Sequence, residues 1–136
     1  MKKLGVIFAM LAVSLIIPAT SFANGWDYQG RDVFTEESKI FKSGGGSFKF
    51  CLSSNSKDGT YRLYEEDPYS TDDWVPNSAL DSGYDPTFKD GTFGSGNNCI
   101  VYRTYDIDEE VDGANDQAEF YIKKWTGGNS TVTVYD

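Results

Sequence analysis

The sequence predicts a small all-β domain, an antiparallel β-sandwich with one disulfide. Several segments alternate apolar and polar residues with a period of two, which is typical of strands with one buried face. Turn-forming Gly, Asn and Asp residues separate these segments, and none of them sustains the 3.6-residue period of a helix. About six short strands joined in this way favour a sandwich, for which C2-like and jelly-roll-like topologies are both open.

The N-terminus has the three parts of a secretory signal peptide over residues 1–23. Two lysines supply the positive start, residues 4–17 form an apolar run, and small side chains at positions 21 and 23 precede a cut before Asn24. The run is short for a membrane span, which needs roughly 20 apolar residues. We therefore expect a secreted, extracellular protein whose single domain is residues 24–136, with no membrane attachment after cleavage.

The expected mature chain is strongly acidic. Loss of the two signal-peptide lysines takes Lys plus Arg from 12 to 10 against 21 Asp plus Glu, a net charge of −11. Nucleic-acid binding depends on Lys and Arg that neutralise phosphates, so this charge argues against nucleic acid and against anionic membranes. It suits divalent cations, basic peptides or neutral sugars. We expect a monomer.

The chain contains no histidine. This excludes Ser-His-Asp and Cys-His catalysis and disfavours a zinc or copper site. Carboxylate-based hydrolysis stays open in principle, but no pair of acidic residues stands out for it, and the domain is small for a core plus a cleft. We therefore expect no enzymatic activity.

The first half of the domain contains two clear strands and one weaker one. Residues 32–41 are the weaker candidate. Residues 47–53 place Phe48, Phe50 and Leu52 on one face, with Cys51 on the opposite face.

The second clear strand covers residues 60–66, in which Tyr61 and Leu63 oppose Arg62 and Tyr64. The Lys-Asp-Gly turn before it predicts a hairpin with the preceding strand.

Residues 67–97 show no clear strand and are rich in Pro and Gly. A stretch this long without regular structure is uncommon in a compact domain. It is either a functional loop, carrying Tyr69, Trp74 and Tyr84, or a loop that covers one end of the core.

Three further strands are expected, over residues 99–106, 118–126 and 131–135. The middle one puts Phe120 and Ile122 on one face. Its other face carries Tyr121, Lys123 and Trp125, so we expect that face to be half exposed. A Gly-Gly-Asn turn predicts a second hairpin before the last strand.

The two cysteines, Cys51 and Cys99, are expected to form a disulfide because the chain is expected to be exported. Closing a loop of that length stabilises the fold by roughly 4 kcal/mol in the chain-entropy model. The bond either ties the outer face of the Cys51 strand to a neighbour, or a bulge re-aims the side chain.

An acidic segment at residues 106–119 resembles the twelve-residue calcium loop of EF-hand proteins. Asp108, Asp112, Asp116 and Glu119 match positions 1, 5, 9 and 12, with the turn glycine between them. Two inner positions depart from the pattern, and both flanks look like strands rather than helices. The sequence therefore predicts a calcium-binding loop between strands rather than an EF-hand, although plain acidic turns explain the same residues.

A second acidic cluster, residues 65–67 with Asp72 and Asp73, follows another strand. If the two clusters lie at one end of the sandwich, they form a shared Ca²⁺ site, by analogy with C2-type sandwiches.

Aromatic residues are numerous, with three Trp and nine Tyr. Trp26, Tyr69, Trp74 and Tyr84 lie outside the expected strands, where flat apolar rings with polar tips suit stacking on sugars or protein contacts. We therefore expect a non-enzymatic domain that binds extracellular carbohydrate or cell-wall material. If the acidic loops bind calcium, the ion stabilises this domain. The alternative is a secreted protein-interaction factor, such as an inhibitor, toxin-like effector or matrix component.

Overall fold

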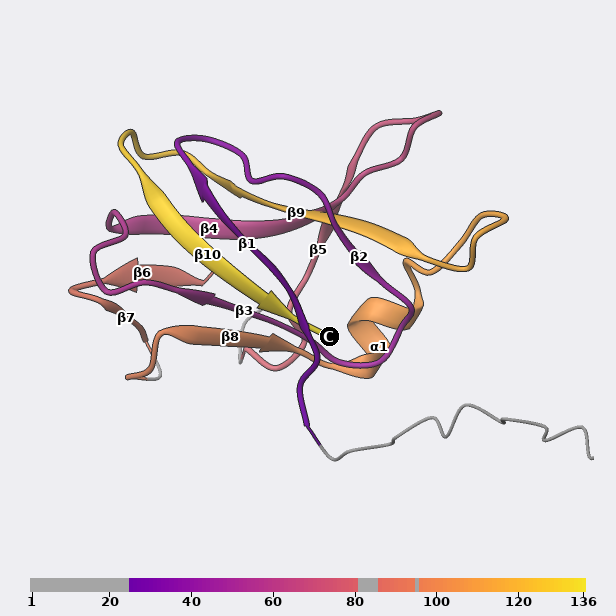
Figure 1. The fold of residues 1–136 in the computed structure, drawn as a ribbon, viewed down its shortest axis with the longest axis horizontal. Helices are drawn as coiled ribbons and strands as arrows, with labels where there is room; N and C mark the ends of the chain where they lie inside the picture. Colours follow the sequence, from indigo (N-terminus) through magenta and orange to yellow (C-terminus); the bar gives the residue numbers. More distant parts are fainter. Residues whose placement is uncertain (1–24, 81–85, 95) are drawn as a thin grey trace, which may run out of the picture.

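A computed structural model describes residues 25–80, 86–94 and 96–136, which include neither the predicted signal peptide nor Tyr84. The described part forms two antiparallel sheets packed face to face (Figure 1). Its elements, in chain order, are β1 (Tyr28–Phe34), β2 (Phe41–Ser43), β3 (Phe48–Leu52), β4 (Gly59–Glu65), β5 (Asp73–Val75), β6 (Thr87–Lys89), β7 (Thr92–Phe93), β8 (Cys99–Tyr102), α1 (Thr104–Asp108), β9 (Ala118–Lys124) and β10 (Ser130–Tyr135).

The first sheet has the strand order β1-β10-β3-β8, and the second has β2-β9-β4-β6-β7 with β5 paired to β4. This confirms the predicted small antiparallel β-sandwich. In the described part, no helix is long and apolar enough to cross a membrane.

The core lies between the two sheets and follows the predicted alternation. The inward residues Phe48, Phe50 and Leu52 of β3 are buried, and so are their counterparts on β4, β9 and β10. Because every second residue of each strand faces inward, the sandwich buries a continuous aromatic and aliphatic layer.

The Cys51–Cys99 disulfide is present. The two cysteines are directly paired across β3 and β8 in a continuous register, and both lie on the outer face of the first sheet. The disulfide therefore ties the back of one strand to its neighbour, which settles the two geometries that the sequence left open.

Neither predicted hairpin forms. β3 lies in the first sheet and β4 in the second, so the Lys-Asp-Gly turn at residues 57–59 carries the chain across the sandwich. The turn at residues 127–129 likewise connects β9 of the second sheet to β10 of the first. Turn residues favour a chain reversal, but they do not specify which sheet edge receives the next strand.

Three further expectations were wrong in part. Residues 67–97 contain β5, β6 and β7, which are too short to show a period. The strand expected over residues 99–106 ends at Tyr102. The short helix α1 follows, with Arg103 as its N-cap. It begins here because the Asp106 carboxylate accepts a hydrogen bond from the Arg103 N–H at 3.1 Å, which is a contact of the capping-box type. The weak strand at residues 32–41 is replaced by the ends of β1 and β2 with a turn between them.

Candidate functional site

Aromatic side chains cross the outer face of the second sheet on three neighbouring strands. Tyr64 of β4 is paired with Trp74 of β5 on one side and with Tyr121 of β9 on the other. The rings of Tyr64 and Tyr121 stack with centroids 5.5 Å apart and an interplanar angle of 17°. Because their strand neighbours Leu63 and Ile122 point into the core, these rings point outward.

Two cations lie among these rings. The Arg62 guanidinium carbon is 5.3 Å from the Trp74 ring centroid and 4.8 Å from that of Trp125, which follows the end of β9. The Lys123 ammonium lies 5.9 Å from the rings of both Tyr64 and Trp125. Cation–π contacts of this kind hold aromatic planes in place while leaving their outer faces open.

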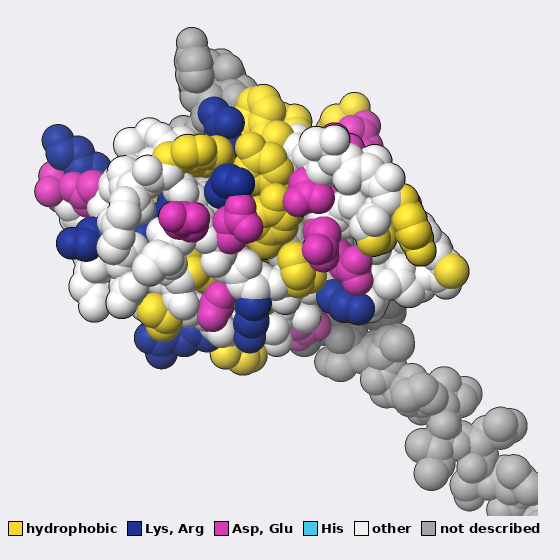
Figure 2. Space-filling view, turned by 90° about the horizontal axis from the view of Figure 1, so that it is seen from above, with side chains coloured by type: hydrophobic (Ala, Val, Ile, Leu, Met, Phe, Trp, Pro, Cys, Tyr) yellow, Lys and Arg dark blue, Asp and Glu magenta, His cyan; other side chains and the backbone are white. Residues whose placement is uncertain are grey.

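We call this surface the aromatic face, made of Arg62, Tyr64, Trp74, Tyr121, Lys123 and Trp125. Its two tryptophans are 43% and 55% exposed, so both rings are accessible to a ligand. Figure 2 shows one side of the molecule, on which a strip of hydrophobic side chains is flanked by basic and acidic groups. Exposed rings gathered on one face make this surface a candidate contact site.

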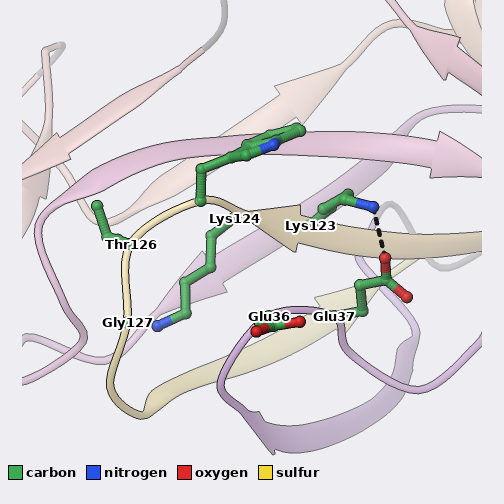
Figure 3. A pocket seen from close by; sticks show the side chains of 7 residues that line it. Glu36, Glu37, Lys123, Lys124, Thr126 and Gly127 are labelled. Carbon is green, nitrogen blue, oxygen red and sulfur yellow. Dashed lines mark hydrogen bonds and ion pairs between the residues drawn. The ribbon is translucent and has the colours of Figure 1, made fainter.

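A cavity of about 300 Å³ adjoins the aromatic face at Trp125. It is lined by Glu36 and Glu37 from the segment after β1 and by residues 123–127 from β9 and its following turn. Figure 3 shows the Lys123 ammonium directed at the Glu37 carboxylate, and the two groups form an ion pair at 2.6 Å. The cavity thus places acceptors and a donor beside an exposed ring.

The charges of the aromatic face are set by its contacts. The Glu37 carboxylate raises the pKa of Lys123, so this ammonium stays protonated at neutral pH. Burial, together with a 2.7 Å hydrogen bond that the Tyr121 hydroxyl donates to Asp72, raises the pKa of Tyr121. Tyr121 is therefore a neutral phenol fixed by Asp72.

The structure separates the aromatic residues that the sequence singled out. Trp74 belongs to the aromatic face. Trp26 packs against the other sheet, with the Lys49 ammonium 4.4 Å from its ring centroid. Tyr69 projects from the loop between β4 and β5 and is 97% exposed. Tyr84 lies outside the described residues.

Sequence reasoning placed Tyr121, Lys123 and Trp125 on one strand face but did not connect them with Trp74 or with Arg62 and Tyr64. The period-two pattern shows which side chains share a face within one strand. It does not show that β5, β4 and β9 are neighbours, and this pairing is what brings the side chains of distant segments together.

A second cavity, of about 410 Å³, lies where the loop between β4 and β5 meets the loop before β9. Both loops project from the same end of the sandwich (Figure 1). We call this the acidic cavity. Its acidic lining residues are Glu65, Glu66, Asp67, Asp112 and Glu119. The structure therefore brings residues 65–67 of one predicted acidic cluster together with Asp112 and Glu119 of the other.

The six predicted calcium ligands are divided by the fold. Asp112 and Glu119 line the acidic cavity, and Glu119 also pairs with Lys42 at 3.3 Å. Asp108 instead accepts a hydrogen bond from the Gly46 N–H at 2.8 Å.

The other three predicted ligands do not line the cavity. Asp72 accepts the hydrogen bond from Tyr121, and Asp73 pairs with Glu65 across β5 and β4. Asp116 has a left-handed φ of 50° in the turn before β9.

The sequence placed Glu65 in the second acidic cluster but did not identify it as a buried ligand candidate. It occupies the third inward position of β4, after Tyr61 and Leu63, and is only 7% exposed. Burial and the nearby carboxylates, Asp112 first among them, raise the pKa of Glu65 to about 7. An acidic residue on the apolar face of a strand is the sequence signal that would have identified it.

Comparison with known proteins relates residues 23–135 to the family described as "YndA coiled coil domain". A protein of Bacillus subtilis (strain 168), described as "Uncharacterized protein YndA", is 33% identical over 118 residues, which cover 86% of this chain and 78% of that protein. No solved structure matches the chain significantly. Within the described residues the fold is a β-sandwich whose one helix, α1, has five residues, so the words "coiled coil" do not describe this part of the chain.

Proposed function

The chain belongs to the YndA family, and from the geometry of the aromatic face we propose that it is an exported, non-enzymatic protein that binds neutral polysaccharide of the cell wall or the surroundings. The observation that carries the proposal is the pair of exposed tryptophans, Trp74 and Trp125, held on either side of Arg62.

Sugar rings are amphipathic in a way that complements this surface. Their C–H faces are apolar and flat enough to stack on an indole ring, while their hydroxyls need donors and acceptors around the rim. Trp74 and Trp125 offer the stacking planes. Lys123 and Glu37, paired at the edge of the adjoining cavity, offer a donor and an acceptor that sugar hydroxyls can share.

The overall charge selects among polysaccharides. The expected mature chain carries a net charge of −11, which repels polyanions at moderate ionic strength. Arg62 and Lys123 lie among aromatic rings, and Lys123 is already neutralised by Glu37. A neutral glycan therefore suits the aromatic face better than an anionic one.

The test is retention on insoluble cellulose, chitin, mixed β-glucan and purified cell-wall glycan, followed by titration with the soluble oligosaccharide of the retained polymer. We expect Trp125→Ala and Trp74→Ala each to weaken binding roughly tenfold, because one stacking plane is lost. Trp26→Ala is the matched control, since it removes an exposed tryptophan that packs against the opposite sheet.

Two results would contradict the proposal. One is a lack of retention on every glycan of the panel, which would favour a protein partner instead. The other is an equal loss of binding in the Trp26→Ala control. Export is tested separately by N-terminal sequencing of the protein from culture medium, where we expect Asn24 as the first residue.

A further inference from the structure

The acidic cavity is lined by the carboxylate of a largely buried side chain, Glu65, whose oxygens are open to the cavity. The Glu65 side chain is more than nine-tenths buried and lines the cavity, and among the described residues no hydrogen bond or ion pair reaches it. Burial of a carboxylate is costly unless a cation or hydrogen-bond donors compensate it. Within the described residues no cation or hydrogen-bond donor contacts the Glu65 carboxylate, so a bound cation would compensate its charge.

The surroundings of Glu65 increase this requirement. Asp112, Glu110, Asp67 and Asp73 all act on it with like charge. Lys42 forms an ion pair at 3.3 Å with Glu119, which is another lining residue of the cavity, and so does not pair with Glu65. The electrostatic potential inside the cavity is therefore negative.

The loops are shaped to hold carboxylates at the cavity. Asp67 is fixed by hydrogen bonds from the Tyr69 N–H at 2.8 Å and the Ser70 hydroxyl at 2.6 Å. The loop carrying Asp112 is closed by a backbone bridge between Asp112 and Gln117. The Glu66 N–H donates to the Glu119 carbonyl at 2.7 Å, which joins the two sides of the cavity.

We propose that the acidic cavity is a binding site for a hard divalent cation of the calcium class, with Glu65 and Asp112 as its charged ligands. Hard cations take carboxylate, carbonyl and water oxygens, which are the groups that this cavity presents. The site is independent of the aromatic face, and the proposal does not require that a glycan binds.

The arrangement predicts a modest affinity. In the described part of the chain, no three acidic side chains converge closely enough to hold an ion by themselves. Two carboxylates with water completing the shell are typical of the weaker calcium sites of extracellular modules, with Kd on the order of 10⁻⁴–10⁻³ M. Such a site fills at millimolar calcium.

The test is thermal unfolding of the full protein in EDTA, in 5 mM CaCl2, in 5 mM MgCl2, and in NaCl at matched ionic strength. We expect calcium to raise Tm by roughly 5–10 °C, because the ion binds the folded chain only. Magnesium should have a smaller effect, since it gives up its water less readily. NaCl should not reproduce the shift.

Variants locate the ion. Glu65→Gln and Asp112→Asn should each reduce the calcium-induced shift to that of NaCl. Asp112 is exposed, so its variant folds even if a change at buried Glu65 disturbs the core.

Asp116→Asn is the matched control, because it removes one charge from the same loop at a position that does not line the cavity, and Asn tolerates its left-handed φ. It should keep the shift. An unchanged Tm in calcium, or a shift that survives in both cavity variants, would overturn the proposal. Neither outcome bears on glycan retention.

Discussion

Lys124 shows how a single buried charge is accommodated at the residue scale. It is the last residue of β9, points inward and is 2% exposed. Its ammonium donates hydrogen bonds to the Gly128 carbonyl and, at 3.0 Å, to the Ser130 hydroxyl. Its ring contact with Phe34, at 5.7 Å, adds a weaker attraction. Lys124 thereby ties the turn between β9 and β10 to the core.

The stability that Lys124 confers depends on pH in a predictable direction. Burial, and then the charge of Lys57, lower the pKa of Lys124 below its ordinary 10.5. Between the lowered pKa and 10.5, the unfolded chain retains a proton that the folded chain has lost, so the free energy of unfolding rises with pH. We expect the wild type to gain stability relative to Lys124→Met as pH rises toward 10.5.

Urea unfolding of both proteins at several pH values between 7 and 10.5 measures this effect. Taking the difference between the two proteins cancels the titration of the groups that do not interact with Lys124. A difference that stays constant across this range would show that Lys124 has the same pKa in the folded and unfolded chains.

At the element scale, the connection into β4 depends on the glycine with which that strand begins. Gly59 has a φ of +150°, and a Cβ there would lie 2.6 Å from the Thr126 Oγ1. The same Thr126 hydroxyl donates to the Asp58 carbonyl at 3.0 Å. The connection from one sheet to the other is therefore packed tightly against the turn that follows β9.

Gly59→Ala should lower the free energy of unfolding by about 1–3 kcal/mol, because it combines an unfavourable φ with a close contact. Denaturant unfolding measures this loss. Gly94→Ala is the matched control, since a Cβ there meets no atom within 4 Å. Equal losses in both variants would mean that neither the φ of Gly59 nor the contact with Thr126 contributes to the effect.

At the scale of the whole molecule, the disulfide closes a loop of 48 residues without occupying the core. Cys51 and Cys99 lie on the outer face of the first sheet, so their replacement leaves no internal cavity. The bond therefore stabilises mainly through the unfolded chain, whose freedom it restricts.

The double variant Cys51→Ser with Cys99→Ser should retain the strand signal in circular dichroism while its unfolding free energy falls by about 2–4 kcal/mol. Reduction of the wild type should lower its stability by a similar amount, and the variant should not respond to reductant. A loss of strand signal in the native variant would instead show that the bond is required for the pairing of β3 with β8.

Much of the local structure is predictable because strand alternation is a short-range property. The buried faces of β3, β4, β9 and β10 follow directly from the spacing of apolar residues such as Phe48 and Phe50. The strands of the 67–97 segment were missed because two or three residues carry no period. α1 was missed because one capping contact at Asp106, rather than a helical pattern, begins it.

The sequence alone determined the acidic charge, the absence of histidine, the pairing of the two cysteines and the inward face of each long strand, because these depend on composition or on adjacent residues. Only the tertiary structure decided which strands are neighbours. Pairing between distant segments placed Tyr64 between Trp74 and Tyr121, and it brought Glu65 to the same cavity as Asp112. A period of two defines the two faces of a strand, whereas long-range register decides which faces combine into a surface.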